Sequence, residues 1–73
     1  MSRLPQVSGR EVVTALKRVG WDEVRQRGSH VIMTKAGCVA SLSIPQHNPL
    51  KRGTLHDLLK RAELTVDELL DLL

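Results

Sequence analysis

The sequence predicts a small α+β domain in which helices cover one face of a three-stranded antiparallel sheet. Apolar residues recur at helical spacing near both ends of the chain, and the middle of the chain alternates with the two-residue period of strands. Glycine and proline residues separate these segments in the order α-β-β-β-α-α. The 73 residues contain no repeat or linker, so we expect a single domain over residues 1–73.

The first helix is predicted over about residues 9–19. Ser8 and Glu11 have the spacing of a capping box, in which each side chain accepts a hydrogen bond from the backbone amide of the other residue. Gly20 stands where a left-handed residue commonly ends a helix. Trp21 follows, and we expect it to be buried beneath this helix. The apolar face of the helix is predicted to consist of Val12, Val13, Leu16 and Val19.

Three strands are predicted at residues 23–27, 30–34 and 39–44. Residues 28–29 and 35–37 have the composition of turns, and Pro45 ends the third strand because it lacks a backbone donor. Both alternation frames of residues 30–34 are partly apolar, so the sequence leaves open which face of the sheet His30 occupies.

Two more helices are predicted after the strands. The second begins at about Gly53, and its apolar face consists of Leu55, Leu58, Leu59 and Ala62. Thr65 and Glu68 repeat the capping-box spacing and open a short final helix. Its apolar face is predicted to be Val66, Leu69, Leu70 and Leu73.

The charge is distributed unevenly along the chain. Residues 1–62 hold eleven bases and four acids, a net charge of +7, whereas residues 63–73 hold four acids and no base. Such a cationic stretch suits a polyanionic partner, although a solvated face that only maintains solubility would have the same composition. The chain has one Trp and no Phe or Tyr, which excludes RNA-binding folds that stack bases on rows of aromatic rings. An RNA partner would therefore be recognised by backbone and shape.

Several classes of chemistry are not indicated by the sequence. Asp22 and Glu23 are neighbours on a predicted strand, point to opposite faces and cannot converge on one metal ion. Cys38 has no basic residue within two positions and no cysteine partner, so we expect a structural role for it. We expect no metal, no small-molecule cofactor and no contact with membranes. Apolar runs are short, and the beginning of the chain lacks the pattern of a signal peptide, so a cytoplasmic location is expected.

The histidines are the residues best suited to catalysis. His30 follows the predicted turn, with Arg25 and Arg27 close before it. An imidazole can take the proton of a ribose 2′-OH, whose oxygen then attacks the adjacent phosphorus while cationic groups stabilise the phosphoryl oxygens. The alternative for His30 is an ordinary strand histidine, and for His47 a solvated loop residue. His56 is most simply a polar-face residue of the second helix.

Segments in order along nearly the whole chain resemble the HicA (YcfA-like) toxin family. The most specific are Arg-Gln-Arg-Gly-Ser-His at residues 25–30 and Leu-Lys-Arg-Gly-Thr-Leu at residues 50–55. Supporting similarities lie at residues 4–12, 44–47 and 59–65. The resemblance implies a fold like that of double-stranded-RNA-binding domains, ribosome-independent cleavage of mRNA and neutralisation by a HicB antitoxin.

The same resemblance implies roles for individual residues. His30 matches the histidine of the family's Gly-Ser-His motif and is expected to be catalytic. Gly28 carries over as the turn residue and Ser29 as a polar neighbour. His47 matches a recurrent loop histidine, whose role is left open between general acid, substrate contact and structural hydrogen bonding. The sequence departs from the family at Met33, where an aromatic residue is common, and at Glu63, where glycine is usual.

Our sequence-based hypothesis is an endoribonuclease toxin that cleaves mRNA without a metal ion, with His30 as general acid or base and with His47 and Ser29 as auxiliary residues. Cations that we expect to hold RNA phosphates are Arg25, Arg27, Lys35, Lys51 and Arg52. One alternative is a non-catalytic RNA-binding module of the same fold. Another is a helix-turn-helix over residues 53–73 that reads DNA, which the acidic last helix disfavours because phosphates would repel it.

Overall fold

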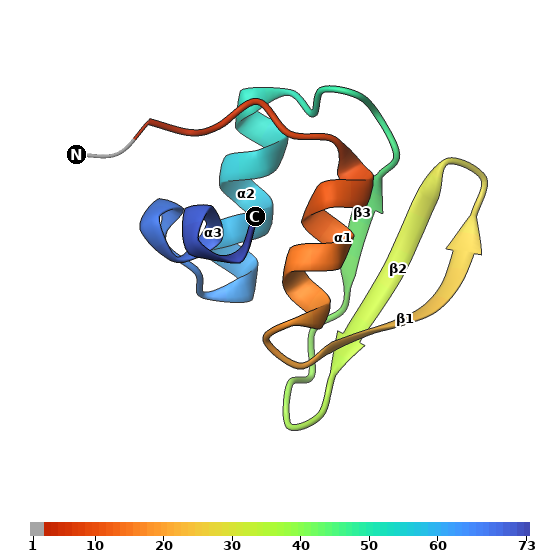
Figure 1. Ribbon diagram of the computed structural model, residues 1–73. Coiled ribbons are helices and arrows are strands. Elements are labelled where there is room, and N and C mark those ends of the chain that lie inside the picture. Colours follow the sequence, from red (N-terminus) through yellow and green to blue (C-terminus); the bar gives the residue numbers. More distant parts are fainter. Residues whose placement is uncertain (1–2) are drawn as a thin grey trace.

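The computed structural model describes residues 3–73 and confirms the predicted order of elements (Figure 1). The elements are α1 (Gly9–Lys17), β1 (Trp21–Arg27), β2 (His30–Lys35), β3 (Leu42–Pro45), α2 (Arg52–Ala62) and α3 (Val66–Leu72). Each strand is joined to the next by a short connection, as expected for an antiparallel meander. The class is α+β.

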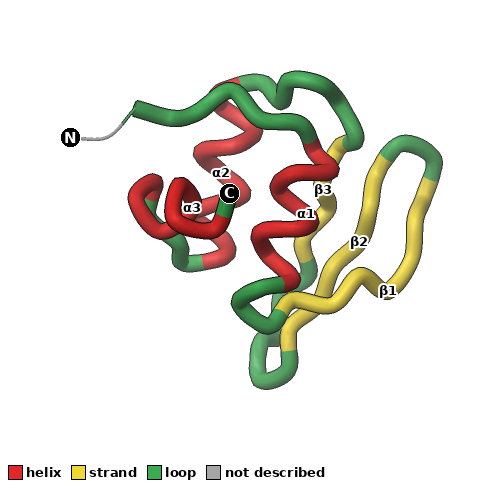
Figure 2. Tube along the Cα trace, viewed as in Figure 1, coloured by secondary structure: helices red, strands yellow, loops and turns green. Residues whose placement is uncertain are grey.

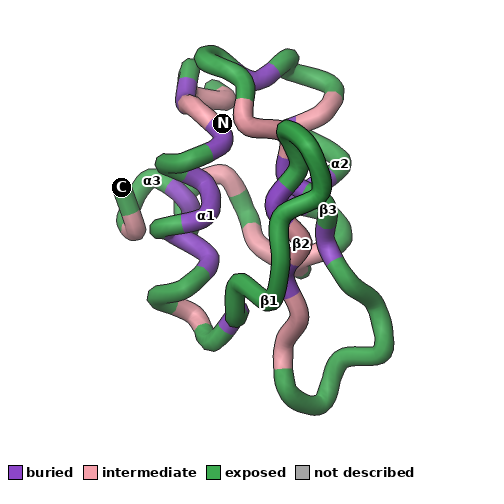
Figure 3. Tube along the Cα trace, turned by 90° about the vertical axis from the view of Figure 1, so that its right-hand side faces the viewer, coloured by how far each residue is buried: buried purple, intermediate pink, exposed green. Residues whose placement is uncertain are grey.

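The sheet has the order β1-β2-β3, with both pairs antiparallel and β2 in the centre. The helices lie together on one side of this sheet (Figure 2). Alternate residues of the strands point toward the helices and are buried, as the two-residue period requires. The opposite face of the sheet carries no helix and is open to solvent (Figure 3).

The core lies between the inner face of the sheet and the three helices. Trp21 is only 3% exposed, which confirms the predicted anchor beneath α1. Burial of each large apolar side chain stabilises the fold by about 1.5–3 kcal/mol relative to exposure. Fully buried core side chains include Leu16, Val31, Met33, Leu42, Ile44, Leu55 and Leu69.

Local hydrogen bonds set the helix boundaries. Both predicted capping boxes are confirmed: the amide of Glu11 donates to Ser8 Oγ over 3.1 Å, and the amide of Glu68 donates to Thr65 Oγ1 over 3.1 Å. At the end of α2, Glu63 adopts a left-handed conformation with φ of 58°. This is a conformation that glycine adopts more easily than glutamate.

Two details of the predicted elements are wrong. The third strand begins at Leu42 rather than at residue 39, and Val39 is fully exposed in the preceding loop. In α3, Leu70 and Leu73 are 42% and 48% exposed, although they were predicted to belong to the apolar face. The short helix touches the core only along a line of residues three apart, Val66, Leu69 and Leu72.

Candidate functional site

His30 lies on the open face of the sheet, which settles the face that the sequence left undetermined. It is the first residue of β2, and its side chain is exposed. Val31 and Met33 are fully buried against the helices, so His30 and Ile32 point the other way. The alternation of β2 therefore presents the imidazole to solvent on the open face.

A β-bulge in β1 places two arginines on the same face as His30. The pairing with β2 shifts register between Glu23 and Arg25, where Val24 is the extra residue. Arg27 is then the cross-strand partner of His30, and Arg25 is the partner of Ile32. Directly paired residues share a face of the sheet, so both guanidinium groups extend from the open face beside the imidazole.

These residues surround a shallow hollow of about 560 Å³. Its lining consists of Arg27, Gly28, His30, Ile32 and Ser43. Ser43 comes from β3, where it is the cross-strand partner of Ile32. The hollow is thus built by all three strands and combines one imidazole, one guanidinium and one hydroxyl group on an apolar floor.

The turn before His30 is tied down by main-chain contacts. Gly28 has φ of 56°, a left-handed conformation that glycine adopts at little cost. The side-chain amide of Gln26 donates to the carbonyl of Gly28 over 3.0 Å. The backbone amide of Gln46 donates to the carbonyl of Ser29 over 2.7 Å, which joins the turn to the loop after β3. Ser29 therefore contributes its main-chain carbonyl to the contact that fixes the turn directly before His30.

His47 lies in that same loop, at the same end of the sheet as His30. Its carbonyl accepts a hydrogen bond of 2.9 Å from the amide of Gly9, the first residue of α1, while its side chain is exposed. A Cβ atom on Gly9 would collide with the carbonyl oxygen of Pro45, so only glycine allows this close approach. The side chain of His47 does not line the hollow around His30.

The remaining predicted phosphate-binding cations lie apart from His30. Lys35 is at the far end of β2, pairs with Trp21 and lines a separate depression together with Arg61. Lys51 is exposed at the N-cap of α2. Arg52 lines a third depression, beside the N-terminal segment. Of the five predicted cations, the structure therefore brings only Arg25 and Arg27 to the open face around the imidazole.

A different group of charges lies on the α1 side of the sheet. The carboxylate of Glu23 is 3.1 Å from Lys17 Nζ and 3.5 Å from Arg10 Nη1. The hydrogen bond from Lys17, together with the positive charges of Lys17 and Arg10, lowers the pKa of Glu23 below its ordinary value of 4.5, against a smaller opposing effect of desolvation. These two cations thus share one carboxylate partner within the fold.

Sequence reasoning did not identify Ser43 or Arg61 as residues near the site. The alternation of Leu42, Ser43 and Ile44 indicates that Ser43 faces away from the core. The strand register that places it diagonally from His30 could not be read from the sequence. Arg61 lies on α2 and reaches the same region only through the packing of that helix beside β3.

Two other sequence expectations concern metal ions and membranes. Among residues 3–73, no three His, Cys, Asp or Glu side chains come close enough to form a metal-binding group. In the same part of the chain, no helix has the length and apolar character needed to cross a membrane. Cys38 is an exposed free thiol in the loop before β3.

Comparison with known proteins gives one family. The sequence model of a family described as "HicA toxin of bacterial toxin-antitoxin" matches residues 9–64, which is more than half of the 73-residue chain and includes every residue of the hollow around His30. Helix α3 lies beyond the matched residues. No curated protein matches the chain. The extent of the family match shows that this chain belongs to the HicA family of toxins from bacterial toxin–antitoxin systems.

Proposed function

We propose that this protein is an endoribonuclease toxin that cleaves mRNA, with His30 as the catalytic histidine. One observation carries the proposal: an exposed imidazole stands in a shallow hollow on the open face of the sheet, directly across from Arg27. Cleavage of RNA by attack of the ribose 2′-OH needs a proton acceptor for that hydroxyl group and positive charge near the phosphate, and these two groups supply both. Membership of the toxin family supports the proposal.

In this mechanism His30 acts as the general base. It takes the proton of the 2′-OH, the freed oxygen attacks the adjacent phosphorus, and the bond from phosphorus to the 5′-oxygen breaks on the opposite side. A general acid then protonates the 5′-oxygen, which leaves a 2′,3′-cyclic phosphate. His47 is the exposed candidate for this acid, because its loop is bonded to the turn before His30.

Arg25 and Arg27 supply the charge that this reaction needs. Neither guanidinium has a carboxylate within ion-pair distance among residues 3–73, so both are free to bind phosphate oxygens. Two donors held on one rigid strand can stabilise the negative charge that builds up as the 2′-oxygen attacks. The chemistry uses no metal ligand, so we expect cleavage to persist in the presence of EDTA.

The proposed biological setting follows from the family. We expect a HicB-type antitoxin to neutralise the protein, and we expect the free toxin to arrest growth by degrading mRNA in the cytoplasm. The proposed substrate class is mRNA, and the hollow is open and shallow, so that an RNA strand can lie across it.

The decisive experiment compares His30→Ala with His56→Ala. Both side chains are exposed, so both variants should fold, but His56 lies on α2, outside the hollow. We expect His30→Ala to lose about 10²- to 10⁴-fold in the rate of RNA cleavage, and His56→Ala to keep wild-type activity. Cleavage is measured on labelled RNA with and without EDTA, and folding is measured by circular dichroism.

Two results would contradict this assignment. Undiminished cleavage by His30→Ala would remove His30 as the catalyst. If the wild-type protein retains RNA but yields no cleavage product under any condition, the chain is instead a non-catalytic RNA-binding module.

A further inference from the structure

We infer that Arg61, together with Thr54, forms a second phosphate subsite beside the His30 hollow, so that bound RNA runs across β3 onto α2. The inference rests on the proposed ribonuclease function and extends it, because it assigns the path of the strand away from the scissile phosphate. Neither the family match nor the sequence reasoning assigns a role to Arg61.

The first observation is that the two depressions are adjacent and share a lining residue. Ser43 lines the hollow around His30 and also lines a neighbouring hollow of about 190 Å³. The other residues of that neighbouring hollow are Thr54, Asp57, Leu58 and Arg61, all from α2. One exposed serine on β3 therefore separates the imidazole from a guanidinium and a hydroxyl group on the adjacent helix.

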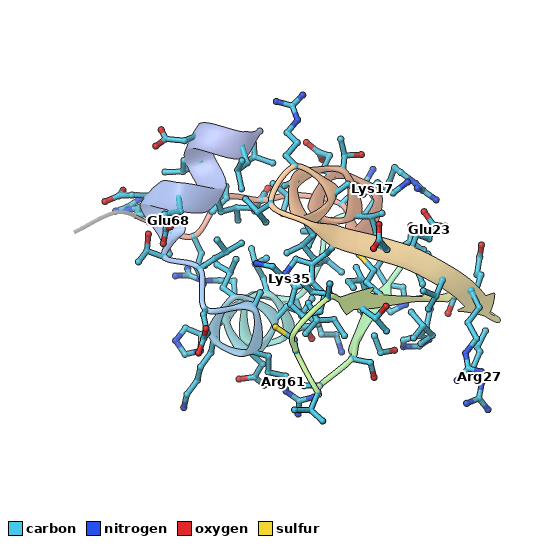
Figure 4. All side chains as sticks on the ribbon, turned by 90° about the horizontal axis from the view of Figure 1, so that it is seen from below. Lys17, Glu23, Arg27, Lys35, Arg61 and Glu68 are labelled. Carbon is cyan, nitrogen blue, oxygen red and sulfur yellow. The ribbon has the colours of Figure 1, made fainter. Side chains whose placement is uncertain are left out.

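The second observation is the direction in which the side chains of Arg27 and Arg61 extend. Figure 4 shows Arg27 and Arg61 extending toward the same side of the molecule, whereas Lys17 and Glu23 lie on the opposite side. A strand of RNA held by Arg27 at the hairpin can therefore cross the edge strand β3 at Ser43 and meet Arg61 on the same side of the molecule. Cations arranged along one face suit the regular charges of a nucleic acid backbone.

The third observation is that Arg61 is not used inside the fold. No carboxylate of residues 3–73 lies within ion-pair distance of its guanidinium, in contrast to Arg10 and Lys17. The one acid in its hollow, Asp57, has its Oδ1 atom 3.9 Å from Nδ1 of His56, and no ion pair joins it to Arg61 among residues 3–73. An unpaired guanidinium beside a threonine hydroxyl provides donors in the arrangement that phosphate oxygens accept.

Arg61 also lies near a cation that was predicted from the sequence. It lines the depression that contains Lys35 and the loop before β3. The order along the path is therefore Arg27, His30, Ser43 and Arg61. Lys35 pairs with the buried Trp21 and so projects from the helix-covered face of the sheet, which leaves Arg61 as the end of the path.

Asp57 makes the inference testable in both directions. Its carboxylate lines the same hollow as Arg61 and repels any phosphate that binds there. Removal of that charge should therefore strengthen RNA binding, whereas removal of the Arg61 charge should weaken it. A gain of affinity cannot be produced by a variant that merely unfolds.

The experiment measures binding of a short fluorescein-labelled single-stranded RNA by anisotropy over a series of salt concentrations. All variants are made in the His30→Ala background, so that the RNA stays intact. Arg61→Gln is compared with Lys60→Gln, its exposed neighbour on α2, which lines none of the hollows that contain Ser43.

We expect Arg61→Gln to weaken binding by roughly fivefold and to reduce the slope of log affinity against log salt concentration by about 0.7. We expect Lys60→Gln to change both by much less, and Asp57→Asn to strengthen binding by about twofold. In the background with an intact His30, Arg61→Gln should raise KM more than it lowers kcat.

Four results would overturn the inference. Arg61→Gln and Lys60→Gln could weaken RNA binding equally, or Asp57→Asn could weaken it. Either result would mean that no phosphate binds in this hollow. Cleavage of RNA by the wild-type protein would still uphold the proposed function. Alternatively, Arg61→Gln could leave RNA binding intact and weaken only the complex with HicB, which would make this surface an antitoxin contact. A wild-type protein that neither binds nor cleaves RNA overturns both proposals.

Discussion

The cations on the two faces of the sheet differ in whether they have a carboxylate partner. On the helix-covered face, Arg10 and Lys17 of α1 meet the carboxylate of Glu23 at 3.5 and 3.1 Å. On the open face, Arg25 and Arg27 stand beside His30 with no carboxylate partner among residues 3–73. A net positive charge is therefore no guide to function until the paired cations have been separated from the free ones.

A single bulge in β1 accounts for much of this difference. In a regular strand Glu23, Arg25 and Arg27 would all share one face, because side chains alternate with a period of two. The extra residue at Val24 shifts the register, so that Glu23 stays with α1 and the two arginines move to the open face. Without the bulge, the carboxylate would stand beside the arginines and reduce their affinity for phosphate.

The largest effect on stability is expected on the helix-covered side, from Gly9→Ala. The added methyl group would collide with the carbonyl of Pro45 and push α1 away from the end of β3. We expect a loss of about 2–3 kcal/mol in the free energy of unfolding, measured by urea denaturation. Ser8→Gly, which weakens the cap but adds no bulk, is the control and should cost only a few tenths of a kcal/mol. Equal losses in the two variants would contradict the close approach.

A smaller effect, on RNA binding, is expected when one cation of each face is replaced, in the variants Arg27→Gln and Lys17→Gln. Arg27→Gln should weaken RNA binding by about 1 kcal/mol, roughly fivefold, and leave thermal stability unchanged. Lys17→Gln should leave RNA binding near the wild-type value, because its ammonium group is already paired with Glu23. The comparison would fail if both variants weakened RNA binding to the same degree.

The smallest effect concerns the pH dependence of stability, tested with Glu23→Gln. Because the pKa of Glu23 is lowered in the folded protein, this carboxylate stabilises the fold above its ordinary value of 4.5, and the contribution is lost as the pH falls through the folded-state pKa. The melting temperature of the variant should therefore lie slightly below that of the wild type at neutral pH, and the two should converge in acid. A difference that grew in acid would contradict this pairing. RNA cleavage should not change.

Local patterns predicted most of the fold. The capping residues Ser8 and Thr65 and the turn at Gly28 each act over a few residues, and each was readable from the sequence. The sequence did not predict the apolar face of α3 correctly. Leucines and acids are mixed along its seven residues, and this pattern fits more than one orientation of the helix. Packing against the core chose the orientation that exposes Leu70 and Leu73.

The candidate site divides in the same way. Among the sequence-predicted residues His30, Gly28 and Arg27, the chain order itself places all three around one hairpin, and they line one hollow. Ser43 and Arg61 joined them only through strand register and helix packing. Lys51 and Arg52 lie between His47 and His56 in the sequence, but the structure places them at the start of α2, outside the hollow.

The sequence by itself determined the order of the elements, their caps and turns, and the motif that presents a histidine after a glycine turn. These features depend on contacts within about one helical turn or one hairpin, and such contacts are encoded by neighbouring residues. The tertiary structure decided which face His30 occupies, which cations are paired with a carboxylate and which remain free. These outcomes depend on the register of three strands and on the packing of helices against them, and both are set by burial of the whole core at once.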